Sequence, residues 1–322
     1  MGRVTTRVPA TRFVVDEPVG ELHGELVAES AAGPRVSVRP RPDTLAVEEP
    51  LEIRVHGEVV AVTMRTPGDD FDLTIGFLLT EGVVAAADDV LGLMHCLDEG
   101  EDGSPTYNVV DVTLRAGAGS VEALASATRS TYTTSSCGVC GKAGIDAIRT
   151  RLPHDVAADP VRVRAADLVR MPDRLREHQG AFDRTGGVHA AGLFTAAGEV
   201  LLVREDVGRH NAVDKVLGAA AREGLLPLAG HVLQVSGRAS FELTQKAAMA
   251  GVPVLSAVSA PSSLAVDLAR DVGLTLAAFV RPPRLTAYSR PDRIDTGEPA
   301  GQPTGQPTAQ PTAQPTHETP GG

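Results

Sequence analysis

Two cysteines, Cys137 and Cys140, lie two residues apart in the stretch TTSSCGVCGKAG, residues 133–144. The sequence contains one other cysteine, Cys96. A pair with this spacing can bind a metal, exchange disulfides, or carry sulfur as a persulfide. Each use requires different neighbours, so the surrounding residues help to distinguish the three.

Zinc is the first possibility. A structural zinc site normally takes four ligands, from two cysteine pairs or from one pair and two histidines. This chain has one pair, with His189 as a candidate third ligand. Zinc deaminases combine a His-x-Glu with a later Pro-Cys-x-x-Cys. Here the cysteine pair comes first, Ser136 replaces the proline, and Ala191 occupies the glutamate position. We therefore predict no metal site.

Disulfide exchange also stays open, because Cys-Gly-x-Cys is similar to thioredoxin-type motifs. Those motifs begin a helix directly after a strand, whereas the preceding stretch SATRSTYTTSS is polar and typical of a loop. The pair could also be structural and partly buried, but its glycines and polar flanks disfavour an apolar role. These neighbours make both interpretations weaker than the third one.

A sulfur carrier agrees best with the neighbours of the pair. Its thiolate must reach a donor and then an acceptor, and Gly138, Gly141 and Gly144 predict a flexible, exposed loop. Lys142 and the start of the predicted helix GIDAIRTRL add positive potential, which favours the thiolate. The second cysteine can then assist by disulfide exchange.

Candidate ligand-binding residues gather at predicted strand-to-helix junctions in the second half of the chain. They are His189 in TGGVHAA, Glu205, Asp206, Arg209 and His210 in EDVGRH, and Ser236, Gly237, Arg238 and Ser240 in SGRAS. Helix N-termini with glycine and serine bind phosphate, and guanidinium groups pair with it. The alternatives are a satisfied strand histidine and ordinary helix caps. We expect both junctions to line a site, and His189 stays open between the two interpretations.

Short apolar segments alternate with helical ones after Pro153. Strands are predicted in VHAAGLFTAAGEVLLVRED, HVLQVSG, VPVLSAVS and LTLAAFV. Helices are predicted in RHNAVDKVLGAAAREG, SFELTQKAAMAG and PSSLAVDLARDVG, with Pro261 in the first turn of the last. Alternation of this kind indicates parallel pairing, and the leading hairpin makes the sheet mixed. We predict an α/β fold with a three-layer mixed sheet and its site at the strand ends.

The rest of the chain divides around this core. Residues 1–35 are expected to be a flexible segment, 36–132 a smaller N-terminal α+β module, 133–153 the cysteine loop and a helix, 154–294 the core, and 295–322 a disordered tail of Pro/Gln/Thr repeats. Within the module, LEIRVHGEVVAVTMRT predicts a hairpin, DDFDLTIGFLLTEGVV a helix that ends at Gly82, and YNVVDVTLRAG a strand.

Composition excludes several classes of protein. The net charge is −11, and no basic run suggests nucleic-acid binding. No apolar run is long enough for a transmembrane helix, and the N-terminus lacks a signal-peptide core, so we expect no membrane partner. An odd count of three cysteines argues against a disulfide framework and for a reduced, cytoplasmic setting.

Several blocks together resemble the FdhD family of formate dehydrogenase accessory sulfurtransferases. In order along the chain they are DDFDLTIGFLLTEGVV, SSCGVCG, FDRTGGVHAA, REDVGRHNAVDKVLG, SGRASFELTQKAAMAGVPVLSAVSAPSSLAVDLA and GLTLAAFVRPPRLTAYS. The similarity covers about residues 43 to 294. It is specific because many blocks occur in the family's order.

The resemblance implies a cytidine-deaminase-like fold without deaminase chemistry, and a homodimer. It assigns the persulfide to Cys137 and makes Cys140 its companion. It also matches the family's cofactor-binding segment to Phe279, Val280, Arg281, Pro282, Pro283 and Arg284. Arginines suit that role, since guanidinium groups bind phosphate bidentately.

We therefore expect a sulfurtransferase that accepts sulfur from a cysteine desulfurase. The resemblance implies transfer to the molybdenum cofactor, Mo-bis-molybdopterin guanine dinucleotide, before this cofactor enters formate dehydrogenase. A guanine nucleotide is expected to share the site. The alternative is a chaperone that binds the cofactor and formate dehydrogenase without sulfur chemistry.

Overall fold

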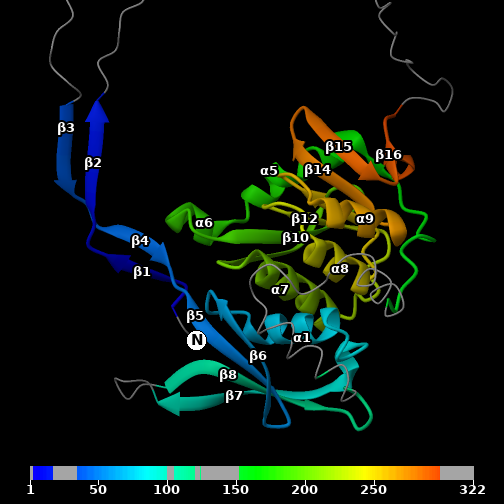
Figure 1. Cartoon of the computed structure of the whole chain (residues 1–322), viewed down its shortest axis with the longest axis horizontal. Coiled ribbons are helices and arrows are strands. Elements are labelled where there is room, and N and C mark those ends of the chain that lie inside the picture. Colours follow the sequence, from blue (N-terminus) through cyan, green and yellow to red (C-terminus); the bar gives the residue numbers. More distant parts are fainter. Residues whose placement is uncertain (1–2, 17–34, 100–104, 120–123, 125–151, 298–322) are drawn as a thin grey trace, which may run out of the picture.

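The computed structural model describes residues 3–16, 35–99, 105–119, 124 and 152–297. Two β-sheets dominate these ranges, a four-stranded one near the N-terminus and a six-stranded one in the second half of the chain. A pair of helices, α1 (Asp70–Thr80) and α7 (Arg209–Arg222), lies between the two sheets (Figure 1).

The N-terminal module is built on strands β5 (Glu49–Val55), β6 (Glu58–Arg65), β7 (Val90–Glu99) and β8 (Pro105–Leu114), in the order β6-β5-β8-β7. The predicted hairpin is confirmed. Its turn residues His56 and Gly57 both have positive φ, at 52° and 84°, as a two-residue hairpin turn requires. The predicted helix is α1, and its apolar residues pack on the inner face of this sheet.

The six-stranded sheet contains β10 (His189–Thr195), β11 (Val200–Asp206), β12 (His231–Val235), β13 (Val254–Ala257), β14 (Thr275–Arg281) and β15 (Arg284–Ser289). Its order is β11-β10-β12-β13-β14-β15, in which β12–β13 and β13–β14 are parallel pairs and the other neighbouring pairs are antiparallel. The predicted mixed α/β architecture is confirmed. The sequence did not predict β15, which returns along β14 to form an antiparallel edge.

Helices cover both faces of this sheet. Neighbouring strand residues alternate between two apolar clusters, so that Leu233 and Leu255 face one layer while Val232 and Val254 face the other. The first layer holds α7, α8 (Phe241–Met249) and α9 (Ser263–Asp271), and the second holds α5 (Met171–Arg176). Whether this layering is deaminase-like stays a prediction.

Shorter elements complete the core. They are β9 (Val163–Arg164), α4 (Ala165–Leu168), α6 (Gly180–Thr185), η1 (Ala87–Asp89), η2 (Pro291–Arg293) and β16 (Ile294–Asp295), which pairs with β9. One boundary differs from the prediction. Ser262 caps α9 by accepting a hydrogen bond from the Ala265 amide, so Pro261 precedes the helix instead of lying in its first turn.

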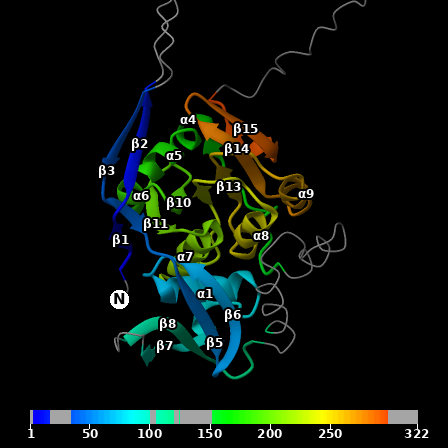
Figure 2. The same cartoon turned by 60° about the vertical axis from the view of Figure 1, so that its left-hand side comes forward.

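The N-terminus differs more from the prediction. Within the segment expected to be flexible, residues 5–8 and 11–16 form strands β1 (Thr5–Val8) and β2 (Thr11–Asp16). Their partners are β4 (Asp43–Ala46) and β3 (Arg35–Pro40). The β2–β3 ribbon projects from the body (Figures 1 and 2). Short strands that pair across a long sequence gap leave little local pattern, which explains why the sequence did not reveal them.

Candidate functional site

The site predicted at the strand ends is assembled by backbone hydrogen bonds. Beyond β12 and β13, the Ser259 amide donates to the Gly237 carbonyl at 3.3 Å, and the Phe279 amide donates to the Ser259 carbonyl at 3.2 Å. The loop after β12 is therefore connected through the loop after β13 to the end of β14. Strands that run parallel bring their carboxyl ends to one edge, where such sheets bind ligands.

His189 reaches the same edge from an antiparallel strand. It begins β10, and its neighbour Ala190 is tied to Ser236 twice. The Ser236 amide donates to the Ala190 carbonyl at 3.0 Å, and the Ser236 hydroxyl accepts from the Ala190 amide at 2.9 Å. The His189 ring thereby lies beside Gly237, with Nδ1 3.5 Å from the point where a Cβ would stand on that glycine.

Cationic residues surround this imidazole. Partial burial lowers the pKa of His189, and the charges of Arg209 and His210 lower it further. Burial also lowers the pKa of Arg209, and the nearby charge of Arg238 acts in the same direction. The structure thus brings His189, Arg209 and Arg238 together, as the sequence predicted for one site. Their combined field favours an anion such as phosphate.

One arginine atom in this group has unused hydrogen-bonding capacity. The Nε of Arg209 is buried and has no hydrogen-bond partner among the described residues. A buried donor left in this state is costly unless a ligand or solvent satisfies it. This observation fits a site that is completed by a hydrogen-bond acceptor.

Glu242 is a member of the cluster that the sequence analysis missed. His210 lowers its pKa to about 2. The His210 Nε2 lies 3.8 Å from the Glu242 Oε2, so the attraction is that of an ion pair and requires a protonated imidazole. The only signal in the sequence was an acidic residue in the first turn of α8, which is common at helix starts.

Asp206 holds the turn that presents Arg209 and His210. Its carboxylate is fully buried and accepts from the amides of Gly208 at 2.8 Å and Thr66 at 3.1 Å. It also pairs with the Lys215 Nζ at 2.8 Å. We expected Asp206 to line the site, and the structure instead makes it an internal anchor for the first turn of α7.

Glu205 has a similar internal use, although we expected it to line the site as well. Its carboxylate oxygens accept from the amides of Ala181 at 2.7 Å and Phe182 at 2.8 Å, at the start of α6. A carboxylate placed there satisfies helix N–H groups that would otherwise have no partner. The acidic half of EDVGRH is therefore structural, and its basic half faces the site.

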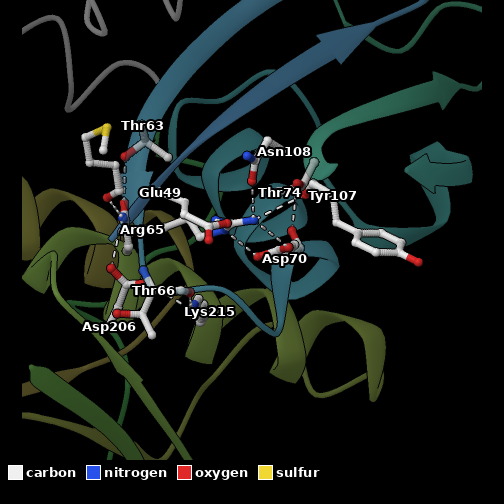
Figure 3. Close-up of polar contacts among 12 residues, drawn as sticks. Glu49, Thr63, Arg65, Thr66, Asp70, Thr74, Tyr107, Asn108, Asp206 and Lys215 are labelled. Carbon is white, nitrogen blue, oxygen red and sulfur yellow. Dashed lines mark hydrogen bonds and ion pairs between the residues drawn. The ribbon is translucent and has the colours of Figure 1, made fainter. Parts of the chain in front are cut away.

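The anchor continues into the N-terminal module (Figure 3). The Thr66 carbonyl accepts from the Lys215 Nζ at 2.8 Å. Beside it, the buried Arg65 pairs with Asp70, with Nε 2.9 Å from Oδ1, and also donates to the Asn108 side chain at 3.2 Å. The N-terminal module thus supports the turn that presents Arg209 and His210.

The four residues predicted in the SGRAS motif have different roles in the structure. The Ser240 hydroxyl accepts from the Leu243 amide at 3.4 Å and caps α8, which is the ordinary interpretation. The Ser236 hydroxyl is occupied by the Ala190 amide. Gly237 lies beside the His189 ring, and the charge of Arg238 acts on Arg209, so both residues belong to the cluster.

The segment Phe279–Arg284 forms the end of β14 and the turn into β15. Phe279 is 39% exposed and has a φ of 51°, which is unusual for a residue with a side chain. Val280 is fully buried in the core, so only its backbone is available to a ligand. Arg281 and Arg284 face each other across the turn made by Pro282 and Pro283, and all four are exposed.

Cys137 and Cys140 lie outside the described residues, and so does the predicted helix that follows them. Cys96 is described: it is a free, half-buried residue on β7. Within the described ranges, no group of three His, Cys, Asp or Glu side chains is placed to hold a metal ion. In the same ranges, none of the helices combines the length and apolar character that crossing a membrane requires.

Comparisons with known proteins agree with one another. The model of the FdhD/NarQ family matches residues 46–295. The sulfur carrier protein FdhD of Mycolicibacterium paratuberculosis is 61% identical over 254 residues, which cover 79% of this chain and 93% of that protein. The FdhD of Streptomyces avermitilis is 57% identical and covers 80% of this chain and 91% of its own.

A solved structure has the same fold. It belongs to a Desulfotalea psychrophila protein described as a formate dehydrogenase accessory protein. The similarity covers 89% of this chain and 99% of that chain, with a TM-score of 0.61 and 22% sequence identity. At this level of identity the likeness concerns the fold.

Proposed function

Because the chain belongs to the FdhD/NarQ family, we propose that it is a sulfur carrier that passes sulfur from a cysteine desulfurase to Mo-bis-molybdopterin guanine dinucleotide. Sulfuration precedes insertion of this cofactor into formate dehydrogenase. The transfer takes place in the cytoplasm, where thiols stay reduced. The observation that carries the proposal is that this chain, whose relatives are named sulfur carrier proteins, contains both a Cys-x-x-Cys pair and a cationic cluster.

The chemistry requires one nucleophilic thiolate. Cys137 attacks the outer sulfur of the persulfide on the desulfurase, and the sulfur–sulfur bond of the donor breaks. The donor leaves as a thiolate, and Cys137 becomes the persulfide. The Cys140 thiolate can then attack the inner sulfur of the Cys137 persulfide, so that the outer sulfur leaves as hydrosulfide for the acceptor and a Cys137–Cys140 disulfide forms. Lys142 favours the thiolate form that the attack needs.

The cationic cluster serves the cofactor instead of the sulfur. Arg209 and Arg238 supply charge for the phosphates, and the buried Nε of Arg209 supplies a donor that awaits an acceptor. Phe279 offers an exposed aromatic face at the same edge for the guanine base. Arg281 and Arg284 extend the positive charge along the β14–β15 turn. A free guanine nucleotide would occupy the same place.

The first test measures intact-protein mass after incubation with a cysteine desulfurase and cysteine. We expect a gain of one sulfur, about 32 Da, that a reductant reverses. The gain should vanish in Cys137→Ala and persist in the matched control Cys96→Ala. A wild-type protein that gains no sulfur would rule out the carrier.

The alternative is a chaperone without sulfur chemistry, because a cationic cluster that binds the cofactor suits either function. The two functions separate in a maturation assay with formate dehydrogenase. A carrier loses function in Cys137→Ala, whereas a chaperone retains it. We expect loss of formate dehydrogenase activity together with unchanged cofactor binding.

The second test measures the affinity of guanosine diphosphate by calorimetry. Charged hydrogen bonds contribute about 1.5–3 kcal/mol each, so Arg209→Gln and Arg238→Gln should each weaken binding about tenfold or more. Arg162→Gln, which changes an exposed arginine beside β9, is the matched control and should bind as the wild type does. Equal affinity in all variants would place the nucleotide elsewhere.

A further inference from the structure

Two buried nitrogen atoms in the cationic cluster lack hydrogen-bond partners among the described residues. They are the Nε of Arg209 and the Nε2 of His210, which lie on consecutive residues in the first turn of α7. A buried donor without a partner is costly, so each atom indicates a place for an acceptor on a ligand. The charge beside His210 differs from the charge around Arg209, and this difference shows what kind of acceptor each atom takes.

Glu242 places a negative charge beside His210. Its Oε2 lies 3.8 Å from the His210 Nε2, too far for a hydrogen bond, and its side chain is 59% exposed. Ser240 and the backbone amide of Glu242 also act on this carboxylate as hydrogen-bond donors. A carboxylate has about four acceptor positions, so it keeps capacity for a ligand. Glu205 and Asp206, by contrast, are used inside the fold.

This carboxylate does not serve phosphate binding. Carboxylate and phosphate repel each other, so Glu242 weakens an anion held by Arg209 and Arg238 unless it contacts a different part of the ligand. The pKa of Glu242 is about 2, so the group is ionised at neutral pH and can only accept hydrogen bonds. The part of the ligand that meets Glu242 therefore carries N–H or O–H donors.

His210 and Glu242 together present a donor beside an acceptor. The protonated imidazole offers the N–H at Nε2, and the carboxylate oxygen stands 3.8 Å away. Guanine has the complementary groups along one edge, in the order carbonyl O6, N1–H and N2–H₂. Adenine has an amino group and a bare ring nitrogen there, so donor would face donor and acceptor would face acceptor. A site with fixed polar groups rejects a ligand that leaves them unpaired.

Backbone contacts bring this pair to the same edge as the exposed ring of Phe279. The loop after β13 contacts the end of β14, where the Ser259 carbonyl accepts from the Phe279 amide at 3.2 Å. The same loop contacts the start of α8, where the Ser262 amide donates to the Ala239 carbonyl at 3.0 Å. Neighbouring strands lie about 4.8 Å apart, so the ends of β12 and β14 are about 10 Å apart. One nucleotide can span this distance.

We propose that His210 and Glu242 select the base of the nucleotide, with His210 donating to O6 of guanine and Glu242 accepting from N1–H and N2–H₂. Both residues then determine specificity for guanine over adenine nucleotides. This inference rests on the proposed function, because it requires the cationic cluster to hold the phosphates of a nucleotide. It adds the side chains that recognise the base.

The test compares the affinities of guanosine, inosine and adenosine diphosphate for the full chain by calorimetry. We expect the wild type to bind guanosine diphosphate about tenfold or more tighter than adenosine diphosphate. Inosine diphosphate should lie between them, because it lacks the N2 amino group. Glu242→Gln should weaken guanosine diphosphate about tenfold, so that it binds like inosine diphosphate. The same variant should not weaken adenosine diphosphate, because it removes a repelling charge.

A carboxylate that only balances charge gives the opposite result. Glu242→Gln would then tighten guanosine and adenosine diphosphate equally, and this outcome would overturn the inference. Glu199→Gln, which changes an exposed residue in the turn between β10 and β11, is the matched control. It should bind all three nucleotides as the wild type does. Unchanged far-ultraviolet circular dichroism confirms that each variant is folded.

Arg209→Gln separates this inference from the proposed function. Loss of a phosphate contact should weaken all three nucleotides by the same factor and leave the preference for guanine intact. If Arg209→Gln has this effect but Glu242→Gln leaves the preference unchanged, the cluster binds phosphates and Glu242 does not recognise the base. A wild type that binds none of the three nucleotides would overturn the proposed site, and this inference with it.

Discussion

His189 lies where burial and two cations act on the same imidazole. Burial alone favours the neutral ring, and Arg209 and His210 reinforce that preference. A histidine whose pKa is lowered in the folded state binds fewer protons there than in the unfolded chain. Its contribution to stability is therefore present above the unfolded value of about 6.5 and is lost as the pH falls toward the folded value.

We predict that the His189 ring titrates below pH 6.5, and that Arg209→Gln raises its pKa part of the way back. The shift stays partial because burial, the largest cause, is unchanged. Nuclear magnetic resonance of the ring protons against pH measures both values. A His189 pKa that does not respond to Arg209→Gln would contradict the assigned cluster.

The crossing of α1 and α7 depends on two glycines. A Cβ at Gly76 would lie 1.8 Å from the Asp214 carbonyl oxygen, and a Cβ at Gly218 would lie 1.9 Å from the Asp72 carbonyl oxygen. Neither distance is possible for a real side chain, so the helices can approach this closely only without Cβ atoms. Glycine costs about 1 kcal/mol in a helix, and the close packing offsets that cost.

We therefore predict that Gly76→Ala and Gly218→Ala each lower the free energy of unfolding by about 3 kcal/mol or more, because the backbones must separate. Urea denaturation followed by circular dichroism measures the loss. The control is Gly180→Ala in α6, where an added Cβ meets nothing within 4 Å. This change should be neutral or slightly stabilising. A similar change in the free energy of unfolding for all three variants would contradict the close crossing of α1 and α7.

Buried polar contacts connect the two modules, so we expect the modules to unfold as one cooperative unit. Lys246 on α8 contacts Asp214 at 2.9 Å, and Asp214 accepts from Thr80 of α1 at 2.9 Å. Asp206 and Lys215 reach Thr66 in the same way. Loss of one partner leaves a buried charge uncompensated, which costs far more than the loss of an exposed pair.

We predict that Asp206→Ala lowers the stability of both modules together, by about 3–5 kcal/mol. Native-state hydrogen exchange should show the same loss in the amides of α1 and of α7. Asp292→Ala, which removes an exposed partner of Arg290, is the matched control. It should leave the amide protection of both α1 and α7 unchanged. Loss of protection in α7 without loss in α1 would show that the modules unfold separately.

From the sequence alone we predicted the central strands, the four longer helices and the residues of the candidate cluster, but not β1 to β4, β7, β9, β15, β16 or the short helices α4, α5 and α6. Alternating apolar strands and capped helices with glycine ends are local patterns, so the core strands, α1, α7, α8 and α9 were predicted. His189, Arg209, Gly237 and Arg238 were predicted together because strand ends of an α/β sheet meet at one edge. Their expected role in anion binding follows from the residue types and from their positions at strand-to-helix junctions.

Only the tertiary structure decided which polar residues face the site and which are internal. Asp206 and Glu205 stand beside Arg209 in sequence, yet one is buried against Lys215 and the other caps α6, because their partners come from distant segments. The paired ribbon, the glycine crossing and the role of Glu242 arise in the same way. Local sequence patterns predict the secondary structure of a short segment. Burial and hydrogen-bond partners depend on contacts between distant segments, which form only in the folded chain.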